Sequence, residues 1–458
     1  MQETQETTIQ EFESEGNGRY DKYPDYKEID RSLPTVPDHW EVRRLKFCAK
    51  INPSKNEVED LDPETEVTFL PMENVSEQGE INREETDLLE EVIDGYTYFK
   101  DGDVLVAKIT PCFENGKGAL AKDLKNGIGF GTTEFVVLRP YGQLNNEFAY
   151  YVTASNLFRK VGEGRMKGAA GQKRVPDEFF QNFPQPLPPE EEQHAIVEFL
   201  DRETDRIKDL IGKMERLIDL IKEEKETIIK DAVIKGLDSD VEMRESGVDW
   251  LGAVPTHWDV PRIRFVARME SGHTPSQSED EYWDGDIPWV SLADSGRMRE
   301  NDYISETEKQ ITEEGLANSS ARILPPETMV FTRDATVGLC AITTREMAVS
   351  QHIIGWICED NLLPEYLLNV TKAMDQELDR LTMGATISTV GMEDIKKLKM
   401  PLPPIEEQEE IVDHLNEELG KFDESIEKIQ EGIDRLKEYR TALLTNAVTG
   451  QIDVRGEV

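Results

Sequence analysis

Basic and amide side chains gather in glycine-rich stretches of the N-terminal half of the chain. Guanidinium, ammonium and amide groups on such loops suit hydrogen bonding to phosphates and to the edges of nucleic-acid bases. Six residues have this character: Lys108, Arg165, Lys167, Gln172, Lys173 and Arg174.

Four loops of the C-terminal half are rich in Thr, Ser, Gln, His and Arg. They are SGHTP (271–275), FTRDATVG (331–338), VSQH (349–352) and MGATIS (383–388). Their candidate residues are His273, Thr274, Arg333, Gln351, His352, Thr386 and Ser388. Ordinary turns have a similar composition, so two interpretations stay open: contact with nucleic acid, or side chains that only satisfy the loop backbone.

Catalytic motifs are missing from the sequence. GIGFG (127–131) has the glycines of a phosphate loop, but a β-type segment follows it instead of a helix, so we predict a turn. The stretch 162–174 lacks P-loop spacing, and INPSK (51–55) is only a fragment of the motif of amino-methyltransferases and is predicted to be a loop. HExxH and GxSxG do not occur. We expect no catalytic residues and no cofactor in this chain.

The cysteines and histidines do not form a metal-binding pattern. Cys48, Cys112, Cys340 and Cys358 lie far apart, without a CxxC pair, and His273 and His352 stand alone. We therefore expect neither a zinc site nor a disulfide framework, and no metal-binding residues.

The chain is strongly acidic, with 94 Asp and Glu against 52 Lys and Arg and a net charge of −42. This charge disfavours a protein held at membranes by basic patches. A solvated surface suited to high salt is the simpler interpretation, and mimicry of nucleic acid is the alternative. The N-terminal stretch is polar and no window approaches 18 apolar residues, so we expect a cytoplasmic protein without membrane contact.

Two segments of the sequence occur twice, which indicates a tandem duplication. VPDHWEVRRLKFCA (36–49) returns as VPTHWDVPRIRFVA (254–267), and PLPPEEEQHAIVEFL (186–200) returns as PLPPIEEQEEIVDHL (401–415). In the first pair, Trp40, Val42, Arg44, Leu45 and Phe47 match Trp258, Val260, Arg262, Ile263 and Phe265. At 458 residues the chain is also long enough for two cores.

A long heptad repeat follows each PLPP segment. Apolar residues recur every seven positions at Leu200, Ile207, Met214, Ile221 and Ile228, and in the second copy at Leu415, Phe422, Ile429, Leu436 and Leu443. The positions four residues later complete the seam, with a polar break shared by Lys225 and Arg440. This pattern predicts two helices of about 40 residues, each roughly 60 Å long, that form a coiled coil.

The simplest partner of each helix is the other copy, paired antiparallel, although packing of each helix on its own domain remains an alternative. Gly236 and Gly450 stand where a helix C-cap favours a left-handed residue. The segments before the helices alternate short strands (101–109, 132–140, 287–292, 327–332) with short helices (146–155, 364–374), which predicts two α+β units.

Taken together, these segments resemble the specificity (S) subunit of type I restriction–modification systems. The resemblance covers about residues 36–455, through the duplicated PLPP-x-EEQ openings, the VP-x-HW segments and the linker RESGVDWLG (244–252). FLPMENV (69–75), PWVSLAD (288–294) and GQKRVP (171–176) resemble stretches of its target-recognition domains.

The resemblance implies two tandem globular target-recognition domains separated by two long helices that pair as an antiparallel coiled coil. The expected divisions are a disordered acidic tail (1–35), a first recognition domain (36–187), a central spacer helix (188–236), a linker (237–253), a second recognition domain (254–402), a C-terminal spacer helix (403–450) and a tail (451–458).

The resemblance also implies partners. Each domain would read one half of a split double-stranded DNA target, while the helices set the spacing and dock two methyltransferase (M) subunits; restriction (R) subunits are a further expected partner. S-adenosylmethionine, Mg²⁺ and ATP are expected only in the partner subunits. A coiled-coil adaptor without nucleic acid, and a fused enzyme, are the alternatives.

Overall fold

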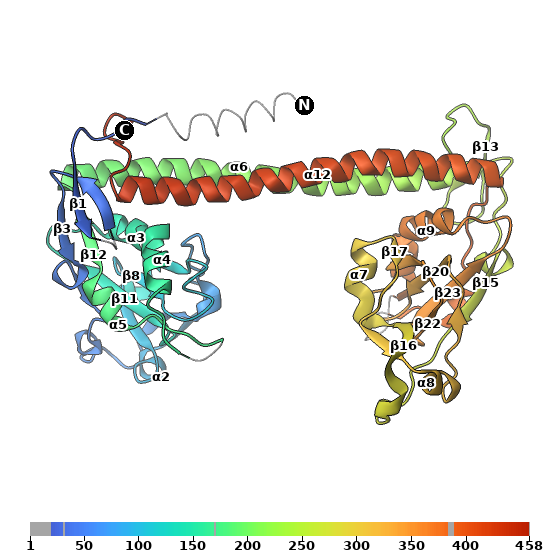
Figure 1. Ribbon diagram of the computed structural model, residues 1–458, viewed down its shortest axis with the longest axis horizontal. Coiled ribbons are helices and arrows are strands. Elements are labelled where there is room, and N and C mark those ends of the chain that lie inside the picture. The colour runs from blue at the N-terminus through green and yellow to red at the C-terminus, as the bar shows by residue number, and fades with distance from the viewer. Residues whose placement is uncertain (1–19, 31–32, 169–170, 383–388, 458) are drawn as a thin grey trace. The chain divides into compact units, whose positions relative to one another are not determined.

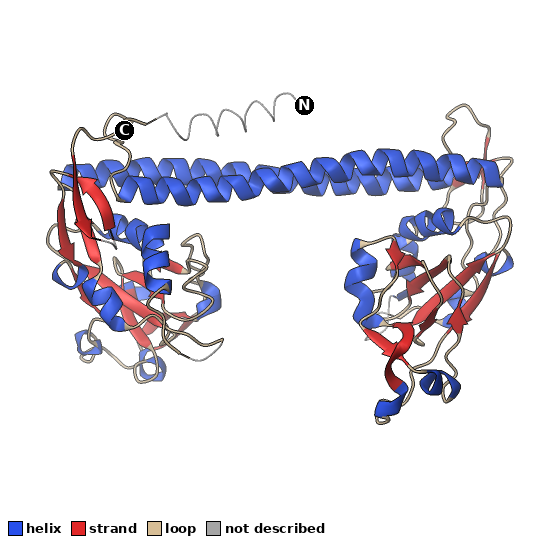
Figure 2. Cartoon of the chain, in the orientation of Figure 1, coloured by secondary structure: helices blue, strands red, loops and turns tan. Residues whose placement is uncertain are grey.

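The structure is a computed structural model that describes residues 20–30, 33–168, 171–382 and 389–457 (Figure 1). The chain divides into two compact units. The first unit comprises Met1–Met214 and Gln430–Val458, and the second comprises Glu215–Ile429. Each unit combines helices with antiparallel and mixed sheets, as the α+β prediction requires (Figure 2).

Two four-stranded sheets form the centre of the first unit. One has the order β4-β11-β8-β9 and is antiparallel throughout; the other has the order β6-β5-β10-β7, with β10 parallel to β5. Their strands are β4 (Ala49–Ile51), β5 (Glu66–Leu70), β6 (Thr86–Leu88), β7 (Thr97–Lys100), β8 (Val104–Ala107), β9 (Gly118–Leu120), β10 (Ile128–Gly131) and β11 (Phe135–Pro140). The helices are α2 (Leu89–Val92), α3 (Asn146–Ala154), α4 (Asn156–Glu163) and α5 (Asp177–Asn182).

The second unit repeats this plan with different lengths. A five-stranded sheet has the order β15-β23-β20-β21-β17, and a four-stranded sheet has the order β18-β16-β22-β19. Their strands are β15 (Ala267–Ser271), β16 (Trp283–Val290), β17 (Tyr303–Ile304), β18 (Lys309–Ile311), β19 (Ile323–Leu324), β20 (Thr328–Thr332), β21 (Cys340–Thr343), β22 (Met347–Val349) and β23 (Ile353–Cys358). The helices are α7 (Ser295–Glu300), α8 (Glu313–Ala317), α9 (Pro364–Ala373), α10 (Asp375–Thr382) and α11 (Met392–Ile395).

The predicted duplication is visible in the strand pairing. In the first unit β11 lies between β4 and β8, and in the second unit β23 lies between β15 and β20. The matched tryptophans of the repeated segment, Trp40 and Trp258, are both buried in the main cores of their units. The repeated sequence therefore builds the same anchor twice.

The two long helices are α6 (Glu190–Lys235) and α12 (Ile405–Val448). Within the first unit, the N-terminal part of α6 and the C-terminal part of α12 share one core, which includes Leu200, Ile207, Leu436 and Leu443. Within the second unit, the C-terminal part of α6 and the N-terminal part of α12 share the other core. This is the antiparallel pairing that was expected of two equivalent copies.

The seam positions behave as the heptad pattern predicts. Each of them is buried or partly buried, from Leu200 to Ala232 and from Leu415 to Ala447. The polar break at Lys225 is occupied by an ion pair with Asp423 of the facing helix. Gly236 and Gly450 follow the helix ends with φ of +76° and +68°, which confirms the predicted left-handed caps.

Two expectations from the sequence are wrong. Residues 26–30 and 33–35 lie in the stretch expected to be disordered, but β1 (Tyr26–Asp30) pairs antiparallel with β2 (Leu33–Pro37), and Tyr23, Leu33 and Val36 bury their side chains in the core. GIGFG is not a turn, because residues 128–131 form β10. A Cβ at Gly129 would lie 2.2 Å from the Phe99 ring, so this strand needs glycine for close packing rather than for phosphate.

Two further strand pairs frame the units. β3 (Glu41–Arg44) pairs with β12 (Pro184–Leu187), and β13 (Met243–Glu245) pairs with β14 (Ala253–Pro255). The second pair gives the predicted linker 237–253 a regular structure. Among the described residues, no helix is both long and apolar enough to cross a membrane.

Candidate nucleic-acid interface

Lys108 lies directly after β8, where three backbone segments of the first unit meet. Its N–H donates to the carbonyl oxygen of Glu134 at 2.9 Å, and its carbonyl oxygen accepts from the N–H of Val175 at 2.8 Å. The loop before Val175 closes through paired backbone hydrogen bonds of 2.9 Å between Lys167 and Arg174. The fold therefore brings three of the predicted residues, Lys108, Lys167 and Arg174, to one end of β8.

The guanidinium of Arg174 is paired with a carboxylate that sequence reasoning missed. Arg174 Nη2 lies 2.6 Å from Glu134 Oε1, and Arg174 Nε donates to Glu134 Oε2 at 2.9 Å. The hydrogen bonds and the charge of Arg174, with the charge of Lys108, hold the pKa of Glu134 below its usual value against the effect of burial. Glu134 immediately precedes β11, so its place before a buried strand was the available signal.

A buried arginine supports the loop that follows Lys108. Arg159 of α4 donates from Nη1 to the carbonyl oxygen of Phe113 and from Nη2 to that of Gly116, both at 3.1 Å. Its guanidinium also lies 4.9 Å from the centre of the Phe113 ring. Burial lowers the pKa of Arg159 to about 10. This residue positions the backbone and is not available to a ligand.

The remaining predicted residues of the first unit are exposed on the same loop. They are Arg165, Gln172 and Lys173, and the Lys167 side chain is exposed as well. The carbonyl oxygen of Lys173 accepts a hydrogen bond of 3.0 Å from the N–H of Thr110, which ties the loop to the segment after Lys108. Exposed cations and an amide on a backbone held at both ends can contact a polyanion without large rearrangement.

The second unit builds the same backbone frame after β20. The N–H of Arg333 donates to the carbonyl oxygen of His352 at 3.0 Å, and the carbonyl oxygen of Arg333 accepts from the N–H of Val390 at 2.9 Å. Lys108 and Arg333 thus occupy equivalent places. Glu134 and His352 are the second equivalent pair, and Val175 and Val390 are the third.

The side chains on this second frame form a chain of hydrogen bonds. Thr274 Oγ1 donates to Gln351 Oε1 at 2.6 Å, Gln351 Nε2 lies 3.0 Å from His352 Nε2, and His352 Nδ1 lies 2.6 Å from Asp334 Oδ2. Because an amide nitrogen can only donate, His352 accepts at Nε2 and donates its proton from Nδ1 to Asp334. The amide of Gln351 therefore has a defined orientation, and within the described part of the chain its second N–H and one oxygen lone pair have no further partner.

Asp334 was not predicted, although it lies in the loop FTRDATVG. Arg333 Nε lies 3.3 Å from Asp334 Oδ2. Burial raises the pKa of Asp334, but hydrogen bonds from His352 and Thr389 and the charge of Arg333 outweigh it, so the pKa lies below the usual value. A short acidic residue beside a cation in a Thr-rich loop was the available signal.

The other candidates of the second unit are His273, Thr386 and Ser388. The His273 side chain is exposed, and its carbonyl oxygen accepts from Trp289 Nε1 at 3.2 Å. Thr386 and Ser388 lie outside the described residues. Four predicted residues, Thr274, Arg333, Gln351 and His352, are thus brought together.

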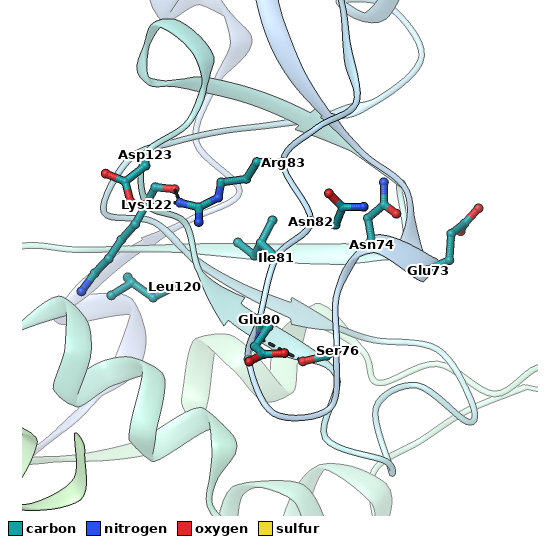
Figure 3. A pocket seen from close by; sticks show the side chains of 11 residues that line it. Glu73, Asn74, Ser76, Glu80, Ile81, Asn82, Arg83, Leu120, Lys122 and Asp123 are labelled. Carbon is teal, nitrogen blue, oxygen red and sulfur yellow. Dashed lines mark hydrogen bonds and ion pairs between the residues drawn. The ribbon is translucent and has the colours of Figure 1, made fainter. Parts of the chain in front are cut away.

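An open hollow of about 680 Å³ lies elsewhere in the first unit (Figure 3). Its two cations are already paired: Arg83 donates to Asp123 at 2.9 Å, and Lys122 lies 3.1 Å from Glu147. Glu73 and Glu80 add negative charge to the lining. This hollow is poorly suited to a phosphate-bearing ligand. Within the described ranges, no group of three His, Cys, Asp or Glu side chains could hold a metal ion.

Comparison with known proteins assigns the chain to a family. The model of the type I restriction modification DNA specificity domain matches residues 37–218 and again residues 255–435. The EcoAI specificity subunit of Escherichia coli is 45% identical over 164 residues, which are 35% of this chain and 27% of that protein. The MjaIX specificity subunit of Methanocaldococcus jannaschii is 34% identical over 198 residues, which are 42% of this chain and 45% of that protein.

Solved structures show the same fold. A chain from a study titled as the structural basis of complex assembly and conformational transition of the type I R-M system has a TM-score of 0.68 at 20% identity, covering 91% of this chain and 99% of that one. The HsdS subunit from Thermoanaerobacter tengcongensis has a TM-score of 0.51 at 20% identity, covering 91% and 98%. With its family model matched twice and its frame built twice, this chain belongs to the type I restriction modification DNA specificity family.

Proposed function

We propose that the chain is the DNA-recognition subunit of a type I restriction–modification complex, in which each unit reads one half of a bipartite target. The observation that carries this proposal is the frame built twice with different side chains. Lys108, Glu134 and Arg174 of the first unit stand where the second unit has Arg333, His352 and Thr389. The same backbone frame with different hydrogen-bonding side chains suits two domains that bind DNA in the same way but contact different bases.

The proposed partners are double-stranded DNA and two methyltransferase subunits, with restriction subunits as further members of the complex. The net charge of −42 opposes binding of the isolated chain to phosphates, so the partners would supply much of the basic surface. S-adenosylmethionine, Mg²⁺ and ATP would be bound by the partners, and this chain would not catalyse. Family membership and the duplicated polar frame favour this function over a coiled-coil adaptor without nucleic acid.

A binding titration tests the partner dependence. The purified chain, alone and with its methyltransferase subunits, is titrated with duplex DNA at matched ionic strength. We expect weak binding alone and much tighter binding in the complex, because phosphate contacts need positive surface. Equal affinity in the two cases would contradict the proposal.

A domain exchange tests the bipartite reading. Residues 257–400 are replaced with the equivalent unit of a relative, and methylated sites are mapped across a genome. The half of the target read by the first unit should stay unchanged while the other half changes. A change in both halves, or in neither, would argue against two independent readers.

A further inference from the structure

Phe47 and Phe265 are the most exposed large apolar side chains among the described residues. Their exposed fractions are 60% and 64%. Neither ring belongs to a hydrophobic cluster of its unit. A core role, which is the usual reason for a phenylalanine, does not explain either residue.

The two rings occupy equivalent places. They match in the repeated segments 36–49 and 254–267, and each is the last residue of a single 3₁₀ turn, Leu45–Phe47 or Ile263–Phe265. The first residue of each turn is buried. In both turns the N–H of this first residue donates to a carbonyl oxygen that follows a short helix. Leu45 donates to Phe183 at 2.9 Å, and Ile263 donates to Leu398 at 3.0 Å.

These turns are held firmly, because the N–H after each ring closes the turn. Cys48 donates to the carbonyl oxygen of Leu45, and Val266 donates to that of Ile263, both at 2.9 Å. The backbone that carries each exposed ring is therefore fixed before a partner binds, so a partner would not have to order the turn itself.

One cation lies over each ring. Lys46 Nζ lies 5.3 Å from the centre of the Phe47 ring, and Arg264 Cζ lies 5.0 Å from the centre of the Phe265 ring. Residues 41–50 contain four basic side chains against one acidic, and residues 259–268 contain three against one. Arg43, Lys50 and Arg268 are ion-paired with Glu41, Glu57 and Glu270, so the cations that border the rings are Lys46 and Arg264.

Such a surface fits a protein better than DNA. Phosphates would use the lysine and arginine groups, but an exposed benzyl ring offers a phosphate no hydrogen bond. A shallow apolar pocket with acidic side chains around it would satisfy both the ring and the cations. Because the surface occurs once in each unit, a partner present in two copies can bind both.

We propose that the Phe47 turn and the Phe265 turn are two equivalent docking points, one for each copy of a single protein partner. This inference rests on the proposed function, under which the partner is the methyltransferase subunit. It assigns the docking to the turns of the repeated segments in addition to the long helices.

The test uses the full chain and the purified methyltransferase subunit. Phe47→Ala and Phe265→Ala are made singly and together, and the mass of each complex and the affinity of each step are measured. We expect each single variant to bind one copy as the wild type does and the other at least about tenfold more weakly, since exposed aromatic residues that fill a pocket dominate interfaces. The double variant should weaken both steps.

Matched controls separate docking from folding. Leu61→Ala and Ile323→Ala remove apolar side chains that are 41% and 42% exposed, one in each unit, and should leave both steps unchanged. Lys46→Glu and Arg264→Glu should weaken binding most at low salt, because they oppose the acidic border of the partner. Thermal unfolding of every variant checks that the units stay intact.

Each outcome decides between the two proposals. If the wild-type chain does not bind the methyltransferase subunit, the proposed function fails. If the wild type binds two copies and the double phenylalanine variant binds them equally well, only the docking inference is overturned. Weaker binding to DNA with unchanged binding to the subunit would also overturn it, since the turns would then contact nucleic acid.

Discussion

The hydroxyl group of Tyr26 donates a hydrogen bond of 2.9 Å to the carbonyl oxygen of Gly450, although 424 positions separate the two residues. Nearby, Gln451 Nε2 donates to the carbonyl oxygen of Thr35 at 3.0 Å. The end of α12 and the strand pair β1-β2 therefore close the first unit together. The second unit makes the equivalent connection with one continuous segment, from Gly236 through β13 and β14 to Trp258.

The two cap glycines should differ in their tolerance of a side chain. Both have positive φ, so alanine costs about 1–2 kcal/mol at either position. A Cβ at Gly450 would lie 2.3 Å from Pro37 Cδ, whereas one at Gly236 would lie 3.1 Å from Trp258 Cζ2. Gly450→Ala should therefore lower the thermal midpoint more than Gly236→Ala. Equal shifts in calorimetry would show that β2 moves freely.

A buried ion pair joins Asp103, which directly precedes β8, to Arg139 of β11. Arg139 donates to Asp103 from Nε at 2.6 Å and from Nη2 at 2.7 Å, and the Asp103 side chain is 1% exposed. Arg139→Leu would leave this carboxylate buried and unpaired, which should cost about 3–5 kcal/mol in urea unfolding. Arg83→Leu is the matched control, because its partner Asp123 is 87% exposed, and it should cost about 0–1 kcal/mol. A large loss in the control would mean that the surface pair also matters.

The frame residues should affect one half of the target each. Alanine at Lys173 or Arg174 should change only the half read by the first unit, and alanine at Arg333 or His352 only the other half. A base contact should cost about 1–3 kcal/mol at one position, whereas a phosphate contact should weaken all sequences alike. Methylation rates on single-base variants of the target distinguish these results. Wild-type rates and selectivity in all four variants would remove these residues from the interface.

Glu57 should make the first unit sensitive to acid. A hydrogen bond from Lys50, aided by Arg139 and the charge of Lys100, outweighs burial and lowers the pKa of Glu57 to about 2. Because the pKa is depressed in the folded state, the ionised carboxylate contributes stability above pH 4.5, and this contribution is lost as the pH falls through about 2. The difference in urea midpoint between wild type and Glu57→Gln should shrink over this range. A constant difference would indicate a role other than charge.

The regular parts of the fold could be predicted because their periodicity is local. The heptads from Leu200 to Ala232 specify a buried seam whatever lies beyond it, and the repeated tryptophans mark equivalent cores. The site could be predicted only in part. Arg174 and His352 could be predicted because they are basic residues in polar loops. Glu134 and Asp334 become their partners only through strand pairing between distant segments. The β1-β2 pair was missed because it is held by residues at the end of α12, more than 400 positions away in the sequence.

The spacer helices offer the most direct test of how the target spacing is set. Met214 and Ile429 are the last residues of α6 and α12 before each helix passes into the other unit. Seven residues inserted after both positions keep the seams in phase and add about 10 Å to each helix. If the helices act as a ruler, the gap between the half-sites should lengthen by roughly three base pairs, at about 3.4 Å each, with both half-sites unchanged.

An insertion in α6 alone is the control for this experiment. It leaves α12 a heptad short, so the apolar residues near Ile218 and Ile221 lose their partners and the thermal midpoint should fall. The doubly extended chain should instead unfold near the wild-type temperature, because both seams stay buried. Mapping methylated sites across a genome then reads the spacer length directly. A stable, doubly extended chain that still methylates the original spacing would show that the recognition units, and not the helices, set the distance.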